Sequence, residues 1–355
     1  MVAIEKGERR IRIEELQPLA NRYGVSVNAL LRREAVHVDL IPRFRRLQES
    51  EEPEVAEAVR LMNDLVSAEV ELEKTLGIDH GREYPPEKFI EPGQGVIAQA
   101  EAHADWLRAY LGLGPGPIAD IFTLIQFSLG IRLFQKRLHS KVSGLFAYDP
   151  QVGATMLLNA NHRWDRRVQS AAHELGHFIG TRQMPEVLEK NERFRSREER
   201  YADAFGRAFL TPAREVMRRF KQLTEADTHV KRSHIILMAH HFGVSREAMV
   251  RRLEELGSVR KGTWEWFKDR GGITDADAER VLGTAYNRYD AAKDEADQLV
   301  PPRMGLMAYQ AWSRELLSEG QLSKLLKLSR IELRQYLHTL EQEEGEADDL
   351  LKLPH

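Results

Sequence analysis

The segment from Ala171 to Phe178, Ala-Ala-His-Glu-Leu-Gly-His-Phe, constrains the fold more than any other part of this 355-residue chain. The apolar residues in and around it recur with the period of one helix face; they are Val168, Ala171, Ala172, Leu175, Phe178 and Ile179. On such a helix His173 and His177 lie one turn apart and project from the same side. The pattern therefore predicts a buried helix whose polar edge, able to hold one metal ion, faces a cleft.

Glu174 is turned by about 80° from the midline of the two histidines, so it is predicted to act as a base and not as a ligand. A His-Glu-x-x-His motif on a helix is the pattern of zinc peptidases. With 13 histidines in the chain, a chance match is the alternative. A zinc site of this kind needs a third protein ligand and leaves its fourth position for water.

A second helix, predicted between Arg197 and Pro212, offers that ligand. Its apolar stripe consists of Ala202, Phe205 and Phe209, and Pro212 lies just past its end. Glu199 and Asp203 are one turn apart on it. We expect Glu199 to be the third ligand and Asp203 to accept a hydrogen bond from the ring of a ligating histidine.

Three blocks of sequence resemble the ImmA/IrrE metallopeptidases. One runs from Lys141 to His177 and includes Met156-Leu157-Leu158-Asn159; the second is Glu199-x-x-Ala202-Asp203-x-Phe205 followed by Leu210-Thr211-Pro212; the third runs from Phe242 to Leu253. Together they cover about residues 95 to 260, and Tyr201 and Gly206 depart from the usual pattern. The resemblance also makes Glu199 the third zinc ligand.

The resemblance implies a cytoplasmic zinc endopeptidase. Its substrate would be a regulatory protein, a helix-turn-helix repressor or an antitoxin, cut to trigger a stress, mobile-element or phage-related transcriptional response. The alternative is a transcription regulator or toxin-antitoxin component that uses the peptidase fold as a binding or sensing platform. A Glu174→Gln variant separates the two, because only the first depends on the base.

Catalysis of this type needs a donor to the oxyanion besides the metal. Tyr201, His234, His240 and His241 are the candidates, and each could equally be an ordinary packed or surface side chain. Gly176, between the two histidines, indicates either close approach of substrate or tight helix packing. Two imidazoles and one carboxylate suit Zn²⁺ and also tolerate Mn²⁺.

Composition narrows the class of protein. The chain has no cysteine, which favours a reducing compartment and leaves any metal to histidine and carboxylate ligands. It shows no secretory leader and no long apolar run, so we expect a cytoplasmic protein without membrane contact, and an oligomer remains open. The net charge of -3 does not indicate that the chain as a whole binds nucleic acid. Local basic clusters such as Arg214, Arg218 and Arg219 are more typical of solvated helix faces.

Residues 1–47 resemble the second half of a repressor-type helix-turn-helix domain, with Gly7 and Gly24 at expected helix ends and Ser26 as a helix cap. The helices that would reach the major groove precede Met1 in that comparison. We therefore expect DNA binding through this segment only if upstream residues complete the domain.

The chain is expected to be α+β and mostly α: a zincin-like minimal metallopeptidase core, with a small sheet and active-site helices, flanked by helix-turn-helix-like modules. The predicted modules are residues 1–47, a helical linker at 48–94, the core at 95–222, a helical module at 223–272 and a C-terminal helical module with an acidic tail at 273–355. The main predicted elements are helices at 54–76, 96–110, 118–129, 224–242, 246–256, 321–326 and 329–338, and strands at 131–135, 144–148 and 154–159.

Overall fold

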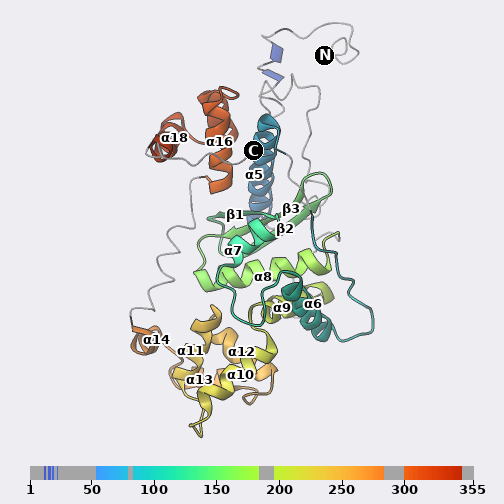
Figure 1. Ribbon diagram of the computed structural model, residues 1–355, viewed down its shortest axis with the longest axis vertical. Coiled ribbons are helices and arrows are strands. Elements are labelled where there is room, and N and C mark those ends of the chain that lie inside the picture. The colour runs from blue at the N-terminus through green and yellow to red at the C-terminus, as the bar shows by residue number, and fades with distance from the viewer. Residues whose placement is uncertain are drawn as a thin grey trace. The chain divides into compact units, whose positions relative to one another are not determined.

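The computed structural model describes residues 12, 15–16, 18–19, 22, 53–78, 83–183, 196–283 and 300–345 (Figure 1). Apart from the few residues near the N-terminus, they form two compact units: a larger one from residues 53–63 and 83–283, and a smaller one from residues 64–78 and 300–345. The repressor-like piece predicted at 1–47 lies almost wholly outside the described residues. Described residues are mostly helical with one small sheet, which confirms the predicted fold class.

The larger unit contains a three-stranded sheet of β1 (Arg132–Lys136), β2 (Gly144–Asp149) and β3 (Gly153–Asn159). The order is β1-β3-β2, with β3 parallel to β1 and antiparallel to β2. The strands agree with the predicted ones to within a residue or two at each end. β3 is the central strand of this order, and every one of its residues is buried. β1 and β2 are therefore the edge strands, which could not be assigned from the sequence.

Helix α8 (Trp164–Gly180) carries the motif and packs between two layers. One side contacts β2 and β3, and the other contacts α9 (Arg197–Leu210), which is in turn covered by α6 (Val96–Tyr110). Figure 1 shows this succession of sheet, α8, and then α9 with α6. The start of α9 is fixed by Ser196, whose hydroxyl oxygen accepts a hydrogen bond from the Glu199 amide.

Small residues let α8 and α9 approach closely. A Cβ atom added at Gly176 would lie 2.8 Å from the Cα of Ala202, and one at Gly206 would lie 3.0 Å from the carbonyl carbon of Ala172. Of the two interpretations of Gly176, tight helix packing is the one that this contact supports. Gly180 leaves room in the same way for the ring of Tyr201, so one of the two residues that depart from the family pattern fills space left by a glycine.

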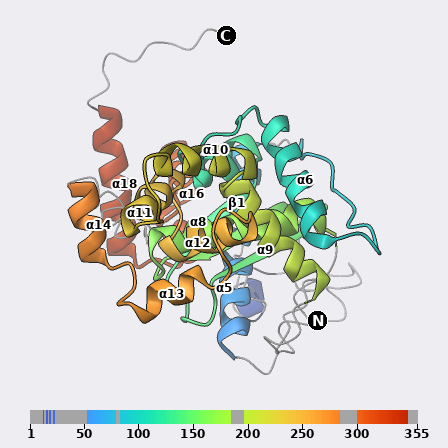
Figure 2. The same ribbon diagram turned by 90° about the horizontal axis from the view of Figure 1, so that it is seen from below.

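The other helices of the larger unit are α7 (Ile121–Thr123), the π-helical turn η1 (Leu124–Ser128), α10 (Ala213–Thr224), α11 (Arg232–Phe242), α12 (Arg246–Glu255), α13 (Thr263–Asp269) and α14 (Asp275–Leu282). Figure 1 shows α10 to α13 close to one another, and Figure 2 shows the same helices from below. The helix predicted from 224 to 242 is wrong in its first part, because α11 begins only at Arg232. The side chain of Asp227 binds Lys231 and His234, and the Lys231 amide donates to the His234 ring, so the chain turns there before the helix starts.

The smaller unit is wholly helical in its described residues. It comprises the later part of α5 (Pro53–Leu76) with α16 (Pro302–Ser313), α17 (Glu319–Leu326) and α18 (Arg330–Gly345). The first residues of the acidic C-terminal tail, Glu341 to Gly345, are helical, and the rest of the tail lies outside the described residues. None of the described helices is both long and apolar enough to cross a membrane.

Candidate metal centre

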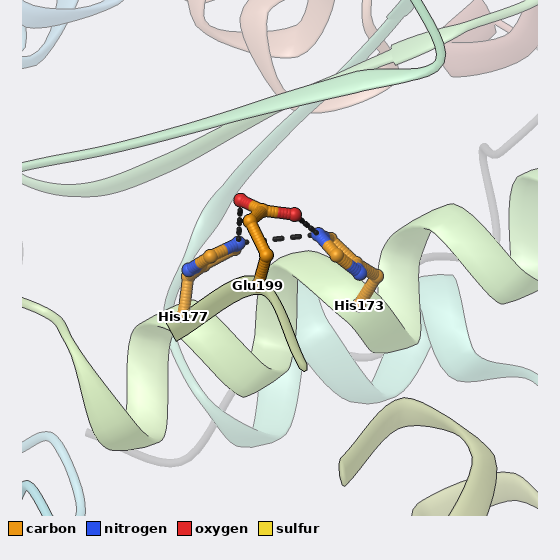
Figure 3. Close-up of side chains that lie close together, drawn as sticks. All are labelled: His173, His177 and Glu199. Atoms are coloured by element: carbon orange, nitrogen blue, oxygen red, sulfur yellow. Dashed lines mark hydrogen bonds and ion pairs between the residues drawn. The ribbon is translucent and has the colours of Figure 1, made fainter. Parts of the chain in front are cut away.

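Three side chains from α8 and α9 converge on one point (Figure 3). The Nε2 atoms of His173 and His177 lie 3.1 Å apart. The carboxylate of Glu199 reaches both of them, with Oε2 3.5 Å from the Nε2 of His173 and Oε1 3.3 Å from the Nε2 of His177. The structure thus brings together the three residues that the sequence singled out as ligands.

These separations fit a metal ion. Ligand atoms at about 2.0–2.1 Å from a tetrahedral zinc lie about 3.3 Å from one another, close to the three separations observed between the two ring nitrogens and the carboxylate of Glu199. The donor set of two imidazoles and one carboxylate is also that of catalytic zinc sites that keep one position open.

The outer nitrogens of both rings have hydrogen-bond partners that assign the protons. The Nδ1 of His173 lies 3.0 Å from Oδ1 of Asp203, a group that can only accept when ionised. The Nδ1 of His177 lies 3.1 Å from the Thr181 hydroxyl, which donates its own proton to the His177 carbonyl and so accepts from the ring. Each Nδ1 therefore carries a proton, which leaves each Nε2 as the ring atom that can bind a metal.

The electrostatics of the cluster favour a bound cation. Burial alone lowers the pKa of His173, but hydrogen bonds to Asp203 and Glu199 and the nearby charge of Glu174 together raise that pKa well above the usual value. For Glu199, burial raises the pKa, and hydrogen bonds and charge from His173 and His177 outweigh this and lower it strongly. The two shifts have one cause: the buried carboxylate of Glu199 stabilises positive charge at the ring nitrogens that face it, whether a proton or a metal ion supplies that charge.

Glu174 lies beside the cluster without belonging to it. Its side chain is buried, and its Oε2 has no hydrogen-bond partner among the described residues. Burial raises its pKa, an effect that the two histidines oppose. A Cβ atom at Gly144, the first residue of β2, would lie 2.8 Å from Oε1 of Glu174. The glycine therefore lets the edge strand pass directly alongside this carboxylate.

Asn159, at the end of β3, fixes the loop that leads into β2. Its amide nitrogen donates to the carbonyls of Leu138, His139 and Val142, and its oxygen accepts from the amides of Leu138 and Asn161.

The roles of Asn159 and Thr181 were not predicted from the sequence, where Asn159 was noted only as part of the family resemblance. A hydroxyl one turn after a ligating histidine is the signal that could have identified Thr181.

The four candidate oxyanion donors are engaged elsewhere. The hydroxyl of buried Tyr201 lies 2.8 Å from Nδ1 of His103, and His234 binds Asp227. His241 contacts the guanidinium of Arg219, and His240 lines a pocket between α8 and α11–α14.

The sequence comparisons agree with this geometry. Residues 127–254 match the family described as the IrrE N-terminal-like domain, peptidase family M78. The match includes the whole sheet, α8, α9, and all but the last residue of α12. No curated protein matches the chain with significance. Over these residues the chain is similar to the M78 peptidases, and the similarity supports a metallopeptidase.

Proposed function

We propose that the protein is a zinc-dependent endopeptidase in which His173, His177 and Glu199 hold the metal. The observation that carries the proposal is the convergence of two Nε2 atoms and a carboxylate at tetrahedral spacing, with both Nδ1 protons already bound elsewhere. Zinc bound there supplies Lewis acidity, which activates water near neutral pH and polarises a peptide carbonyl. Mn²⁺ suits the same donor set.

Glu174 is the general base in this proposal. Its carboxylate is next to the ligand pair, has no hydrogen-bond partner at Oε2 among the residues that the structure describes, and has a pKa that burial raises. A carboxylate in that state accepts the proton of the attacking water and returns it to the amine nitrogen as the peptide bond breaks. Asp203 and Thr181 hold the two imidazole rings in place during these steps.

The outer edge of β2 offers a way to bind substrate. No described strand pairs with that edge, and Gly144 brings it against Glu174. An extended peptide aligned with β2 would add main-chain hydrogen bonds and lay its backbone beside the base. Such binding requires a flexible or locally unfolded segment in the substrate and little particular sequence.

The substrate class rests on the resemblance alone. We propose a cytoplasmic regulatory protein, a helix-turn-helix repressor or an antitoxin, whose cleavage changes transcription. The absence of cysteine is in keeping with a reducing compartment.

The test is a search for new peptide termini. Zinc-loaded protein and its Glu174→Gln variant are incubated with a proteome-derived peptide library, and new N-termini are identified by mass spectrometry. We expect cleavages by the parent that disappear in Glu174→Gln although the variant still holds zinc. Identical terminus lists from the two proteins would favour the binding or sensing platform and end the proposal of hydrolysis.

A further inference from the structure

Helices α17 and α18 form a helix-turn-helix with a tight three-residue turn. Lys327 follows α17 with a left-handed backbone, φ 55°, and Ser329 precedes α18. The turn is closed by the Leu328 amide, which donates to the Ser323 carbonyl. Ser329 and Glu332 cap the start of α18 by exchanging hydrogen bonds between side chains and amides. This is the arrangement in which the second helix of a DNA-binding pair is presented to the major groove.

A third helix supports the pair. Helix α16 packs against both α17 and α18, and Tyr336 of α18 lies against Gly305 of α16, where no side chain would fit. The inward positions of the pair are apolar and buried: Leu322, Leu333 and Leu337. The packing of the three helices thus fixes the direction in which the outer face of α18 points.

The outer face of α18 is exposed and carries side chains able to read bases. Ile331, Arg334, Gln335 and His338 lie on one helical face, and all four are exposed. Arginine recognises guanine, glutamine recognises adenine, and an apolar side chain contacts the methyl group of thymine. Ile331 is 72% exposed. An isoleucine so open on an otherwise polar face fits an apolar contact with a partner.

The end of α17, the turn and the first part of α18 carry a local excess of basic residues. Residues 321–340 hold Lys324, Lys327, Arg330 and Arg334 against the single acidic Glu332. The other acidic residues of the two helices lie at their outer ends; they are Glu319, Glu341, Glu343 and Glu344. Lys324 and Arg330 form no ion pair with a described residue. Lys327 pairs with Asp64, and Arg334 with Glu319; both pairs are largely exposed, and such pairs are weak enough to exchange for phosphate.

A second helix pair of this shape among the described residues, α11–α12, lacks such a face. Its turn also has a left-handed residue, Gly243, but α12 is packed into the larger unit. Arg252 of α12 is buried and ion-paired with Glu101, and Met249, Val250 and Leu253 lie in the core. A helix held in this way cannot enter a groove of DNA.

We propose that α17–α18 binds double-stranded DNA, with α18 in the major groove and Lys324 and Arg330 on the phosphates. The site is separate from the metal centre and does not depend on the proposed hydrolysis.

The test is fluorescence anisotropy with a random-sequence 30-base-pair duplex and the full chain. The double variant Arg330→Ala/Arg334→Ala is compared with Arg260→Ala/Lys261→Ala, which removes two exposed charges outside the pair. We expect about tenfold weaker binding for the first variant and a salt dependence shallower by about 2 on the log-log plot, with little change for the second. Equal losses in both, no binding by the parent, or binding to single strands as tight as to duplex would overturn the proposal.

A second variant keeps the proposal testable if charge removal disturbs folding. Gln335→Ala is carried through selection of preferred duplexes from the random pool. We expect a changed preference at one base position; an unchanged preference contradicts base reading by α18. The Glu174→Gln variant should bind duplex like the parent, so failure of hydrolysis and failure of DNA binding are distinguished.

Discussion

The helix pair α8–α9 and the helix pair α17–α18 use polar side chains in opposite directions. In α8–α9 the ligand atoms of His173, His177 and Glu199 converge between two helices held close by glycine and alanine. In α17–α18 the polar residues diverge from an apolar seam toward solvent. Because the ligand atoms of α8–α9 converge, their geometry is set before a metal binds. The exposed side chains of α17–α18 gain interaction energy only when a partner binds. One missing or added atom should therefore matter far more in the first pair than in the second.

The largest effect is expected for Glu174→Gln. Removing the base should lower peptide hydrolysis by about 10²–10⁴-fold, the usual contribution of a positioned proton acceptor, while zinc content stays at the parental level. Glu198→Gln on α9, which has no hydrogen bond or ion pair with another described side chain, is the matched control and should hydrolyse normally. Initial rates on a peptide from the terminus screen give the comparison, and equal rates in Glu174→Gln and parent would contradict the role of Glu174.

A single methyl group should disturb the convergent pair. Gly176→Ala places a Cβ 2.8 Å from the Cα of Ala202, so α9 must shift, which costs about 1–3 kcal/mol of unfolding free energy and displaces Glu199 from the histidines. Gly116→Ala, where no atom lies within 4 Å of the added Cβ, is the control. Denaturant unfolding and zinc affinity are measured together. Parental values of both for Gly176→Ala would show that the close contact does not set the site.

The hydrogen bonds that hold the rings of His173 and His177 should contribute to zinc affinity to different degrees. Asp203→Ala removes a carboxylate acceptor from His173 and is expected to weaken zinc binding by about 10–100-fold. Thr181→Val removes a neutral acceptor from His177 and should weaken it less, because charge-assisted hydrogen bonds are stronger. Competition against a chromophoric chelator measures both affinities. If Thr181→Val weakened zinc binding more than Asp203→Ala, the hydrogen bond from His173 to Asp203 would not be the more important of the two.

The left-handed residues in the turns of α11–α12 and α17–α18, Gly243 and Lys327, offer a matched pair of substitutions. Gly243→Ala should lower stability by about 1–2 kcal/mol, because φ is 66° and the Trp164 ring lies 3.2 Å from the added Cβ. Lys327→Gly relieves a left-handed backbone at the cost of chain entropy and an exposed ion pair, so the net change should stay below about 1 kcal/mol. Thermal unfolding of each variant reports the difference. A larger loss of stability for Lys327→Gly than for Gly243→Ala would contradict the view that the turn of α17–α18 is less constrained than the turn of α11–α12.

The smallest expected effect concerns the support of α9 by α6. Burial, with help from the charge of Lys88, lowers the pKa of His103, whose ring binds the Tyr201 hydroxyl. The unfolded chain then binds the proton more readily, so stability is lost as pH falls below the usual histidine value of about 6.5. The melting temperature of the parent should fall more between pH 7.5 and 5.5 than that of His103→Gln. Parallel falls would exclude His103 as the cause.

Much of this arrangement follows from periodicity in the sequence. The apolar spacing around Ala171 to Phe178 and the stripe of Ala202, Phe205 and Phe209 place two helices with His173, His177 and Glu199 on facing sides. The structure brings these three residues together, and their roles as ligands remain a proposal. The short apolar runs bounded by turn residues before the motif also predicted the three strands.

The remainder depends on contacts that a single sequence does not display. Thr181 and Asn159 act through side-chain hydrogen bonds at the ends of elements, where no period marks them. The break before Arg232 is set by Asp227 binding two side chains ahead of it. Tyr201 suited an oxyanion donor by type, but its position on α9 directs it to His103 and Gly180.

The most direct test of the metal centre is zinc content by elemental analysis on the parent, His177→Ala and Glu199→Ala, each loaded with one equivalent of zinc and passed through a desalting column. The three-ligand centre predicts about one retained zinc in the parent and little in either variant. A parent that retains no zinc, or variants that retain it as fully as the parent, would contradict the assignment of His173, His177 and Glu199 as the metal site.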